Sequence, residues 1–137
     1  MSKVSYTAVR NVMSPDPLVI DGLATVREAI DAMRAKKVSS LVIDRRYPGD
    51  EYGIVVVHDV AEHVIGRGLS TERTNIYEIM SKPVLCLDAE MDIKYAVRML
   101  TRFGLSRALV MEKGALVGVV TQRDLVFRFL RADEEGG

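Results

Sequence analysis

Two residues near the C-terminal end, Thr121 and Asp124, combine side chains at a spacing that suits a sugar phosphate. They follow an apolar run, so they stand where a strand ends and a helix begins, and the unpaired N–H groups of a helix start favour an acceptor. A carboxylate there can accept hydrogen bonds from both hydroxyls of a ribose, and a hydroxyl three residues earlier can contact a phosphate. The same spacing also describes an N-cap and its N3 acid, which only stabilise the helix. Spacing alone favours the capping role, because caps are far commoner than sites.

Two arginines, Arg107 and Arg123, are the cations available to this pair. A guanidinium group has the fork geometry that matches the oxygens of a phosphate. An isolated arginine is as often a solvated surface group, so both roles stay open for each of them.

Other catalytic or metal-binding patterns are missing from the sequence. His58 and His63 are five residues apart, which does not place them on one helix face as a metal pair requires. Cys86 lies in an apolar run and is predicted to be a small buried residue. No group of residues combines a nucleophile, a base and an orienting partner, so we expect neither a metal site nor an enzyme.

The amino-acid composition limits the kinds of function that the protein can have. Of the 137 residues, 48% are hydrophobic, 19 are basic and 19 are acidic, so the net charge is zero. Nucleic-acid-binding domains usually carry an excess of basic residues, so this balance argues against a nucleic-acid partner. The single cysteine excludes an intramolecular disulfide, no apolar run approaches the roughly 18 residues of a membrane span, and the first residues do not resemble a secretion signal. We therefore expect a cytoplasmic protein with no membrane segment.

The chain repeats itself. A shift of 67 residues places Met13-Ser14 on Met80-Ser81, and a shift of 65 residues places Gly53-Ile54-Val55 on Gly118-Val119-Val120 and Asp59 on Asp124. Apolar positions and turn residues match together, which chance seldom produces. Each copy is too short to fold comfortably alone, so we expect the two to share a core.

Each copy has the pattern of a β-α-β-β-α unit. The first long helix of copy one starts at Thr25, with Glu28 completing a capping box, and that of copy two starts at Asp92. Apolar residues at i, i+3, i+4 and i+7 follow both starts. The last helix of each copy begins near Asp59 or Arg123. The predicted strands cover residues 18–20, 40–43 and 53–57 in copy one, and 84–87, 108–111 and 116–120 in copy two.

With these motifs the sequence resembles a tandem pair of CBS domains, the regulatory module named after cystathionine β-synthase. The resemblance rests on Val12-Met13-Ser14-Pro15, on Ile79-Met80-Ser81-Lys82-Pro83, and above all on Gly118-Val119-Val120-Thr121-Gln122-Arg123-Asp124, which fits the Gly-apolar-x-Ser/Thr-x-x-Asp signature. It implies an α/β (α+β) fold of two repeats related by pseudo-twofold symmetry. The repeats would cover residues 8–67 and 76–131, with a linker at 68–75 and a flexible tail at 132–137.

The resemblance also implies a function. Many such pairs bind AMP, ADP, ATP or S-adenosylmethionine in clefts between their repeats, without catalysis, and associate further into homodimers that a regulated protein partner reads. The ligand residues that it implies here are Met13, Pro17, Leu18, Val38, Ser39, Ser40, Arg107, Val119, Thr121, Arg123 and Asp124. The alternative is an assembly or dimerisation module with vestigial clefts.

The first copy departs from the signature, because Val56 stands where a hydroxyl is expected, while Asp59 is kept. A valine cannot donate to a phosphate. We therefore expect one competent site around Asp124 and one weaker or empty site. The residues of this second site would be Met80, Val84, Leu85, Leu105, Ser106, Ile54 and Asp59.

Overall fold

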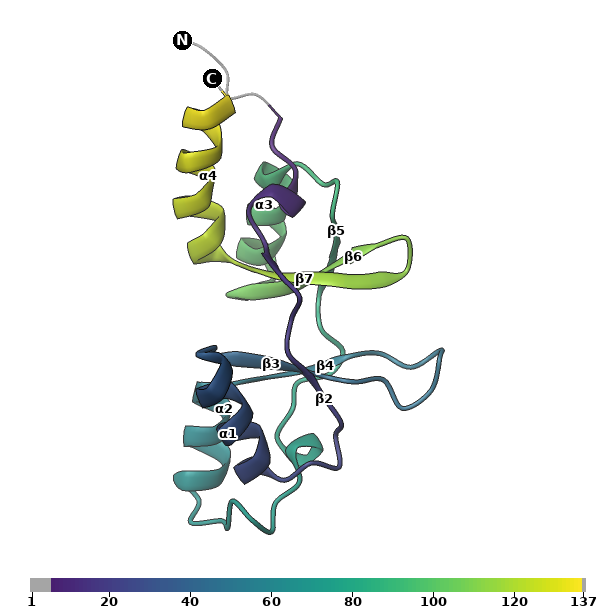
Figure 1. Cartoon of the computed structure of the whole chain (residues 1–137), viewed down its shortest axis with the longest axis vertical. Helices are drawn as coiled ribbons and strands as arrows, with labels where there is room; N and C mark the ends of the chain where they lie inside the picture. The colour runs from purple at the N-terminus through teal and green to yellow at the C-terminus, as the bar shows by residue number, and fades with distance from the viewer. Residues whose placement is uncertain (1–5, 137) are drawn as a thin grey trace. The chain divides into compact units, whose positions relative to one another are not determined.

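The chain is a mixed α/β protein made of two units, shown in Figure 1. The structure is a computed structural model that describes the backbone of residues 6–136 and the side chains of residues 6–130. The segment expected to lack a secretion signal (residues 1–5) and the last tail residue, Gly137, lie outside the described residues. We call residues 18–84 the N-terminal unit, and residues 85–136 with the segment before Leu18 the C-terminal unit.

The N-terminal unit contains β2 (Val19–Ile20), α1 (Val26–Lys36), β3 (Ser40–Ile43), β4 (Gly53–Val56), α2 (Val57–Val60), the π-helical turn η2 (Ala61–Ile65) and the 3-10 turn η3 (Ile76–Glu78). The C-terminal unit contains the 3-10 turn η1 (Val9–Asn11), β1 (Ser14–Pro15), β5 (Cys86–Asp88), α3 (Ile93–Phe103), β6 (Arg107–Glu112), β7 (Ala115–Thr121) and α4 (Gln122–Gly136).

The first long helix of each repeat, α1 or α3, starts at its predicted N-cap residue. The Thr25 hydroxyl accepts from the Glu28 N–H at 3.1 Å, and the Glu28 carboxylate accepts from the Thr25 N–H at 3.3 Å. The Asp92 carboxylate accepts from the Lys94 N–H at 3.1 Å and caps α3. α3 ends at Gly104, whose φ of 65° turns the chain out of the helix at no steric cost. The capping predictions are confirmed.

The sheet of the N-terminal unit has the order β2-β3-β4, with β2 parallel to β3 and β3 antiparallel to β4. Residues 41–43 of β3 are buried without alternation, as expected of a strand covered on both faces. Val26 and Ala29 of α1 pack on this sheet together with Val60 and Val64 of the second helical segment. This unit therefore has its own apolar core.

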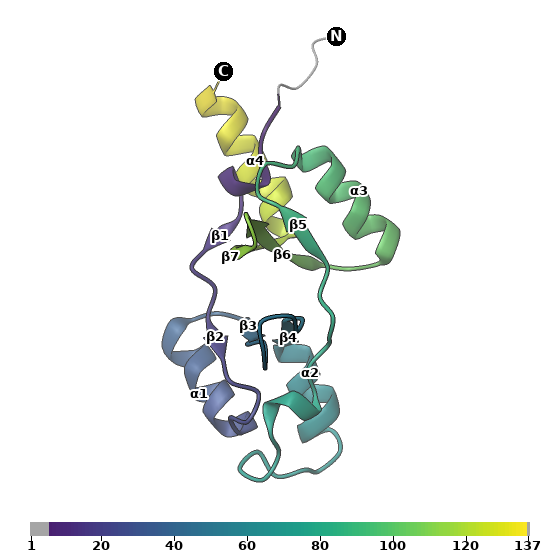
Figure 2. The same ribbon diagram turned by 90° about the vertical axis from the view of Figure 1, so that its right-hand side faces the viewer.

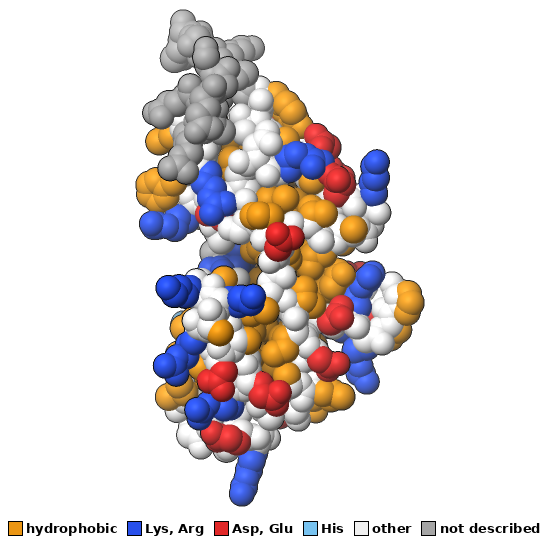
Figure 3. All heavy atoms as spheres, viewed as in Figure 1, with side chains coloured by type: hydrophobic (Ala, Val, Ile, Leu, Met, Phe, Trp, Pro, Cys, Tyr) orange, Lys and Arg blue, Asp and Glu red, His pale blue; other side chains and the backbone are white. Residues whose placement is uncertain are grey.

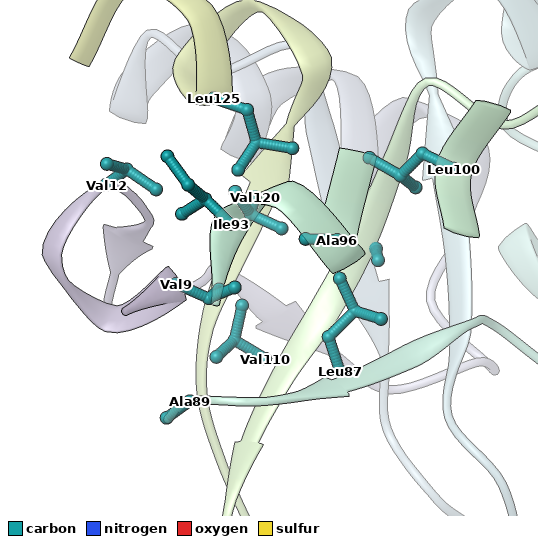
Figure 4. Close-up of a cluster of buried hydrophobic side chains, with 11 residues drawn as sticks. Val9, Val12, Leu87, Ala89, Ile93, Ala96, Leu100, Val110, Val120 and Leu125 are labelled. Atoms are coloured by element: carbon teal, nitrogen blue, oxygen red, sulfur yellow. The ribbon is translucent and has the colours of Figure 1, made fainter. Parts of the chain in front are cut away.

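The sheet of the C-terminal unit has the order β1-β7-β6-β5. β6 and β7 form the predicted hairpin, whose turn residues Lys113 and Gly114 have φ values of 50° and 80°, as a type I′ turn requires. Figure 4 shows the core beneath the sheet, where Val110 and Val120 of the hairpin face Ile93 of α3. Leu125 of α4 is 2% exposed and closes the same core.

Each sheet is completed by the segment that precedes the other repeat. β1 runs antiparallel to β7, with Ser14 opposite Val119. Figure 2 shows the two strands side by side. In the N-terminal unit Ser81 forms the corresponding antiparallel bridge with Ile54, through hydrogen bonds of 3.0 and 2.9 Å. In both units, therefore, a short segment that precedes the other repeat pairs with the edge of the sheet. We call this arrangement the edge exchange.

The glycine that opens the signature makes room for this exchange. A Cβ on Gly118 would lie 2.5 Å from the Met13 sulfur and 2.8 Å from the Ser14 carbonyl oxygen. A Cβ on Gly53 would lie 2.6 Å from the Met80 sulfur. All three distances are shorter than real contacts, so a side chain at either position would force the methionine that crosses the strand to shift. This explains why the Met-Ser and Gly-apolar motifs occur together in both copies.

The structure corrects four details of the sequence analysis. Each unit has a buried apolar cluster of its own, where one shared core was expected. Cys86 is exposed rather than buried, because its strand alternates and Leu87 is the residue that faces the core. Val57 begins α2 instead of ending β4. The backbone of residues 132–136, predicted as a tail, continues α4 to Gly136.

Candidate functional site

The strand–helix junction of the C-terminal unit holds both residues with which the sequence analysis began. Thr121 is the last residue of β7, and Asp124 lies in the first turn of α4. The Thr121 hydroxyl oxygen accepts from the Asp124 N–H at 3.0 Å, so the hydroxyl does act as an N-cap. The Asp124 carboxylate has another partner: one of its oxygens lies 3.5 Å from Nε of Arg128. Its side chain is 18% exposed, so it stays within reach of a small molecule.

Arg128 is a residue of this junction that the sequence analysis missed. Its Nη1 donates to the Met13 carbonyl oxygen at 2.7 Å and to the Val12 carbonyl oxygen at 3.4 Å. The same side chain thus joins the acid of α4 to the segment that leads into β1. The one available signal was its spacing of four residues from Asp124, which brings two side chains together on a helix.

Arg107 stands beside Thr121 on the neighbouring strand. The β6–β7 register places these two residues directly opposite each other. Side chains opposite one another in antiparallel strands point to the same face of the sheet. The Arg107 Nε is buried and has no hydrogen-bond partner among the described residues. A cation with an unused donor, a hydroxyl and a carboxylate therefore meet at one end of this sheet.

The other predicted ligand residues divide between the two units. Met13, Val119 and Pro17 belong to the C-terminal unit and are half-buried. Arg123 is also in this unit, but its guanidinium stacks over the Phe127 ring, 4.9 Å from the centroid, on the exposed side of α4. The predicted residues that lie in the N-terminal unit are Leu18, Val38, Ser39 and Ser40, and their role as ligand residues stays a prediction.

Val38 and Leu105 occupy equivalent positions of the two repeats, each just before the strand that follows the long helix. They are 41% and 38% exposed. The resemblance implies that Val38 belongs to the stronger ligand site and Leu105 to the weaker one. The exposed fractions show that neither is a core residue, so each offers an apolar surface close to a strand start.

The Asp59 site has a different local structure. Without a hydroxyl at Val56, the Asp59 carboxylate itself accepts from the Val56 N–H at 2.9 Å and caps α2. Beside it lies a groove of about 410 Å³ that Asp59 and Met80 line together with His63 and Arg67. Of the remaining residues predicted for this site, Ile54 and Val84 belong to the N-terminal unit, whereas Leu85, Leu105 and Ser106 belong to the C-terminal unit.

The most strongly perturbed acid described lies elsewhere, in the β3–β4 loop. Lys82 Nζ donates to the Asp50 carboxylate at 2.8 Å, and the Arg46 N–H donates to it at 2.9 Å. The hydrogen bond from Lys82 and that from the Arg46 backbone lower the pKa of Asp50 from 3.8 to about 2. This pair ties the loop to the segment that leaves the N-terminal unit.

The two histidines belong to α2 and to the turn η2 that follows it. His58 Nε2 lies 3.0 Å from a Glu62 carboxylate oxygen, and His63 lines the groove beside Asp59. Among the described residues no three His, Cys, Asp or Glu side chains gather as metal ligands would. Likewise, within residues 6–136, no helix has the length and apolar character needed to cross a bilayer.

Known proteins share both the sequence pattern and the fold. The family model described as CBS domain matches twice, at residues 9–66 and 76–131. An uncharacterized 33.4 kDa protein in a ribosomal RNA operon of Thermofilum pendens is 26% identical over 93% of this chain. An uncharacterized protein of Methanopyrus kandleri is 27% identical over 90% of the chain. The chain spans only 45% and 60% of the lengths of these two relatives.

Solved structures extend the comparison. A hexameric CBS-CP12 protein from bloom-forming cyanobacteria superimposes with a TM-score of 0.84 at 30% identity, over 89% of this chain and 67% of that one. The CBS domain of a bacterial CNNM/CorC-family Mg²⁺ transporter, solved in complex with ATP, superimposes with a TM-score of 0.75 at 20% identity, over 90% of this chain and 87% of that one. The second likeness is one of fold.

Proposed function

Because the chain belongs to the CBS-domain family, whose members act as regulatory ligand-binding modules, we propose that it binds an adenine nucleotide and does not transform it. The observation that carries the proposal is the junction of the C-terminal unit, where Arg107, Thr121 and Asp124 stand together. AMP, ADP and ATP share the groups that this junction can recognise. S-adenosylmethionine shares the adenosine but brings a positive charge in place of phosphate.

Each side chain has a role in this proposal that follows from its chemistry. The Asp124 carboxylate accepts from the ribose hydroxyls, with Arg128 holding it in place. The Arg107 guanidinium, whose Nε has no other acceptor in the described part of the chain, donates to a phosphate. The N–H groups at the start of α4 add a favourable field for the same phosphate. Met13 and Val119 supply apolar contacts beside them.

The Asp59 junction is the weaker site. Its carboxylate already accepts from the Val56 N–H, and the valine offers no hydroxyl. A ribose must compete with that hydrogen bond, which lies within the protein and costs nothing to keep. We therefore infer one strong site for each chain.

Isothermal titration calorimetry and thermal unfolding with AMP, ADP, ATP and S-adenosylmethionine test the proposal. A nucleotide present at 100 times its dissociation constant adds about 2.7 kcal/mol to the free energy of unfolding. Asp124→Ala abolishes this gain, and Asp59→Ala is the matched control that keeps it. Two equal sites for each chain, or full binding by Asp124→Ala with an unchanged circular dichroism spectrum, would overturn the proposal.

A second candidate function is an assembly module, and it is favoured by the apolar residues exposed on α4. In that case every nucleotide leaves the unfolding transition in place, while the mass of the particle rises with protein concentration. The two functions are compatible, since the residues that carry them differ. In a regulatory module, occupancy by the ligand shifts the balance between two arrangements that a partner protein distinguishes.

A further inference from the structure

A cavity of about 510 Å³ lies in the N-terminal unit, at the end of the sheet where the parallel strands β2 and β3 finish. Asp21 follows β2, Asp44 follows β3, and both residues line the cavity. The Asp44 N–H donates to the Ile20 carbonyl oxygen at 2.9 Å, so the strands stay paired up to the cavity. Open α/β sheets commonly bind small molecules outside the carboxyl ends of their parallel strands. The volume is also within the range of about 300–1,000 Å³ that is typical of ligand pockets.

This cavity is distinct from the proposed nucleotide junctions. Asp59 follows β4, which runs antiparallel to β3, so Asp59 and Asp44 lie at opposite ends of the sheet. Asp124 belongs to the other unit. A ligand in the cavity therefore contacts none of the groups that we propose for the ribose or the phosphate.

The second repeat has charged side chains at the equivalent positions. The shift of 67 residues between the repeats places Arg10 on Tyr77 and Leu23 on Glu90. In the C-terminal unit the Arg10 guanidinium forms an ion pair with Glu90. Tyr77 and Leu23 cannot form that ion pair, and they are 47% and 73% exposed. The first repeat therefore has an open, partly apolar cavity where the second repeat has a contact within the chain.

One wall of the cavity is apolar and is held in place by the backbone. Ile43 is buried, Met80 is half-buried, and both line the cavity beside Tyr77. The Tyr77 N–H donates to the Gly22 carbonyl oxygen at 3.1 Å. A Cβ on Gly22 would lie 3.3 Å from side-chain atoms of Ile43 and Tyr77, so the glycine lets these two residues approach closely. The wall is formed before a ligand arrives, which lowers the cost of binding.

The polar part of the lining carries both signs of charge. Asp21 and Asp44 each accept a backbone N–H through Oδ1, at 2.7 and 2.8 Å, and no described residue donates to their Oδ2 atoms. The Arg46 guanidinium has no hydrogen-bond or ion-pair partner among the described residues, so it is not paired with either acid. Figure 3 shows acidic and basic side chains next to one another over the loop between β3 and β4. The cavity therefore offers acceptors and a donor that do not satisfy one another.

The other two basic residues of the lining are already engaged. The Arg45 guanidinium lies over the Tyr52 ring, 4.9 Å from the centroid. Lys82 Nζ donates to the Asp50 carboxylate at 2.8 Å. Of the basic side chains that line the cavity, Arg46 is the one available to a ligand.

We propose that this cavity binds a free α-amino acid with an apolar side chain. The ammonium group of the ligand donates to Asp21 and Asp44, and its carboxylate accepts from the Arg46 guanidinium, whose fork matches a carboxylate. The apolar side chain of the ligand covers Tyr77 and Ile43 and is removed from water. A simple anion meets two acids and a simple cation meets Arg46, whereas a zwitterion pairs with both. The site is independent of the proposed nucleotide site.

Isothermal titration calorimetry of the full chain with L-leucine, L-methionine and L-phenylalanine, without nucleotide, tests the proposal. The tightest binder is then compared with its carboxamide, which lacks the anionic group, and with its deamino acid, which lacks the ammonium group. Each analogue binds about tenfold or more weakly, because hydrogen bonds between charged groups are lost. L-Alanine keeps both charges but has little apolar surface to bury, and it also binds about tenfold or more weakly.

Two variants test the residues. Arg46→Gln and Asp44→Asn each weaken binding of the amino acid by about tenfold or more. The carboxamide binds Arg46→Gln to within about threefold of the wild type, because the group that Arg46 contacts is missing from this ligand. Arg34→Gln removes the same charge from an exposed position of α1 and is the matched control that keeps wild-type affinity. Circular dichroism verifies that each variant is folded.

Three results overturn the proposal: no binding of any of the three amino acids at about 10 mM, an analogue that binds as tightly as its parent, or a folded Arg46→Gln or Asp44→Asn variant with wild-type affinity. The analogues test the site in the wild-type protein, so a variant that fails to fold does not leave it unexamined. Asp124→Ala keeps amino-acid binding and Arg46→Gln keeps nucleotide binding. Failure of this site and failure of the proposed nucleotide site are therefore separate outcomes.

Discussion

Arg128 and Asp124 lie one helical turn apart on α4, with Nε of the arginine 3.5 Å from a carboxylate oxygen of the acid. The same guanidinium donates to the Met13 carbonyl oxygen, more than a hundred residues earlier in the chain. The acid proposed to receive a ribose is therefore positioned by a side chain that also holds the segment before β1. The position of the Asp124 carboxylate and the attachment of the segment before β1 therefore both depend on Arg128.

Replacement of Arg128 by methionine keeps the aliphatic stem and removes these interactions. We expect the free energy of unfolding to fall by about 1–2 kcal/mol, because charged donors to backbone carbonyl oxygens are worth that much when partly exposed. We also expect nucleotide affinity to fall, since Asp124 loses its orienting partner. Urea unfolding and calorimetry measure the two effects. Unchanged stability would show that water replaces the guanidinium without loss.

Alanine at Gly118 is more harmful than alanine at Gly53. Both substitutions push a Cβ into a methionine, whose flexible chain can move aside, but Gly118 also faces the Ser14 carbonyl oxygen at 2.8 Å. Overpacking of this kind costs about 1–3 kcal/mol, and we expect Gly118→Ala at the upper end and Gly53→Ala at the lower. Urea unfolding of the two variants gives the comparison. Equal losses would contradict the difference that the backbone contact predicts.

The substitution Thr121→Val gives the second repeat the residue that the first repeat has at Val56. The hydroxyl cap on the Asp124 N–H is lost, which costs about 0.5–2 kcal/mol. Asp124 is then free to accept from the backbone N–H of residue 121, as Asp59 accepts from the Val56 N–H. We expect nucleotide binding to fall further than stability does. Thr121→Ser, which keeps the hydroxyl, is the control, and equal binding by both variants would rule out this role of the cap.

Asp50 makes the stability of the folded protein sensitive to acid. Its pKa is lowered from 3.8 to about 2 by hydrogen bonds from Lys82 and from the Arg46 backbone. A group whose pKa is depressed in the folded state stabilises that state above its unfolded pKa. This contribution is complete above about pH 4 and is lost as the pH falls toward 2. Asp50→Asn flattens the dependence of the unfolding temperature on pH in that window, and an unaltered slope would show that other acids control it.

Local features of the chain were predictable from the sequence. Thr25, Glu28 and Asp92 cap their helices as the pattern indicates, because a cap depends on residues at most three positions apart. The hairpin turn at Lys113 and Gly114 is local in the same sense. The residue pattern predicted the order of the elements in each copy, which the structure confirms, and the family match confirms the resemblance.

Contacts between distant residues were not predictable in the same way. The pairing of Ser14 with Val119 and the hydrogen bond from Arg128 to Met13 depend on the folded arrangement, which no short pattern encodes. The exposure of Cys86 depends on which face of β5 meets the core, and a short apolar run does not reveal that face. The register that sets Arg107 opposite Thr121 is also a contact between distant residues, and the binding roles of Thr121 and Asp124 stay predictions.

The edge exchange also sets the order in which the protein is completed during synthesis. Ser14 emerges from the ribosome early, and its partner Val119 follows about 100 residues later, a delay of about 5–20 s at ordinary rates of translation. Until then the nascent chain exposes an unpaired extended segment with Met13 uncovered. A truncated chain that ends after the first repeat leaves that segment without its strand, so shortened products of this gene are expected to attract chaperones or proteases.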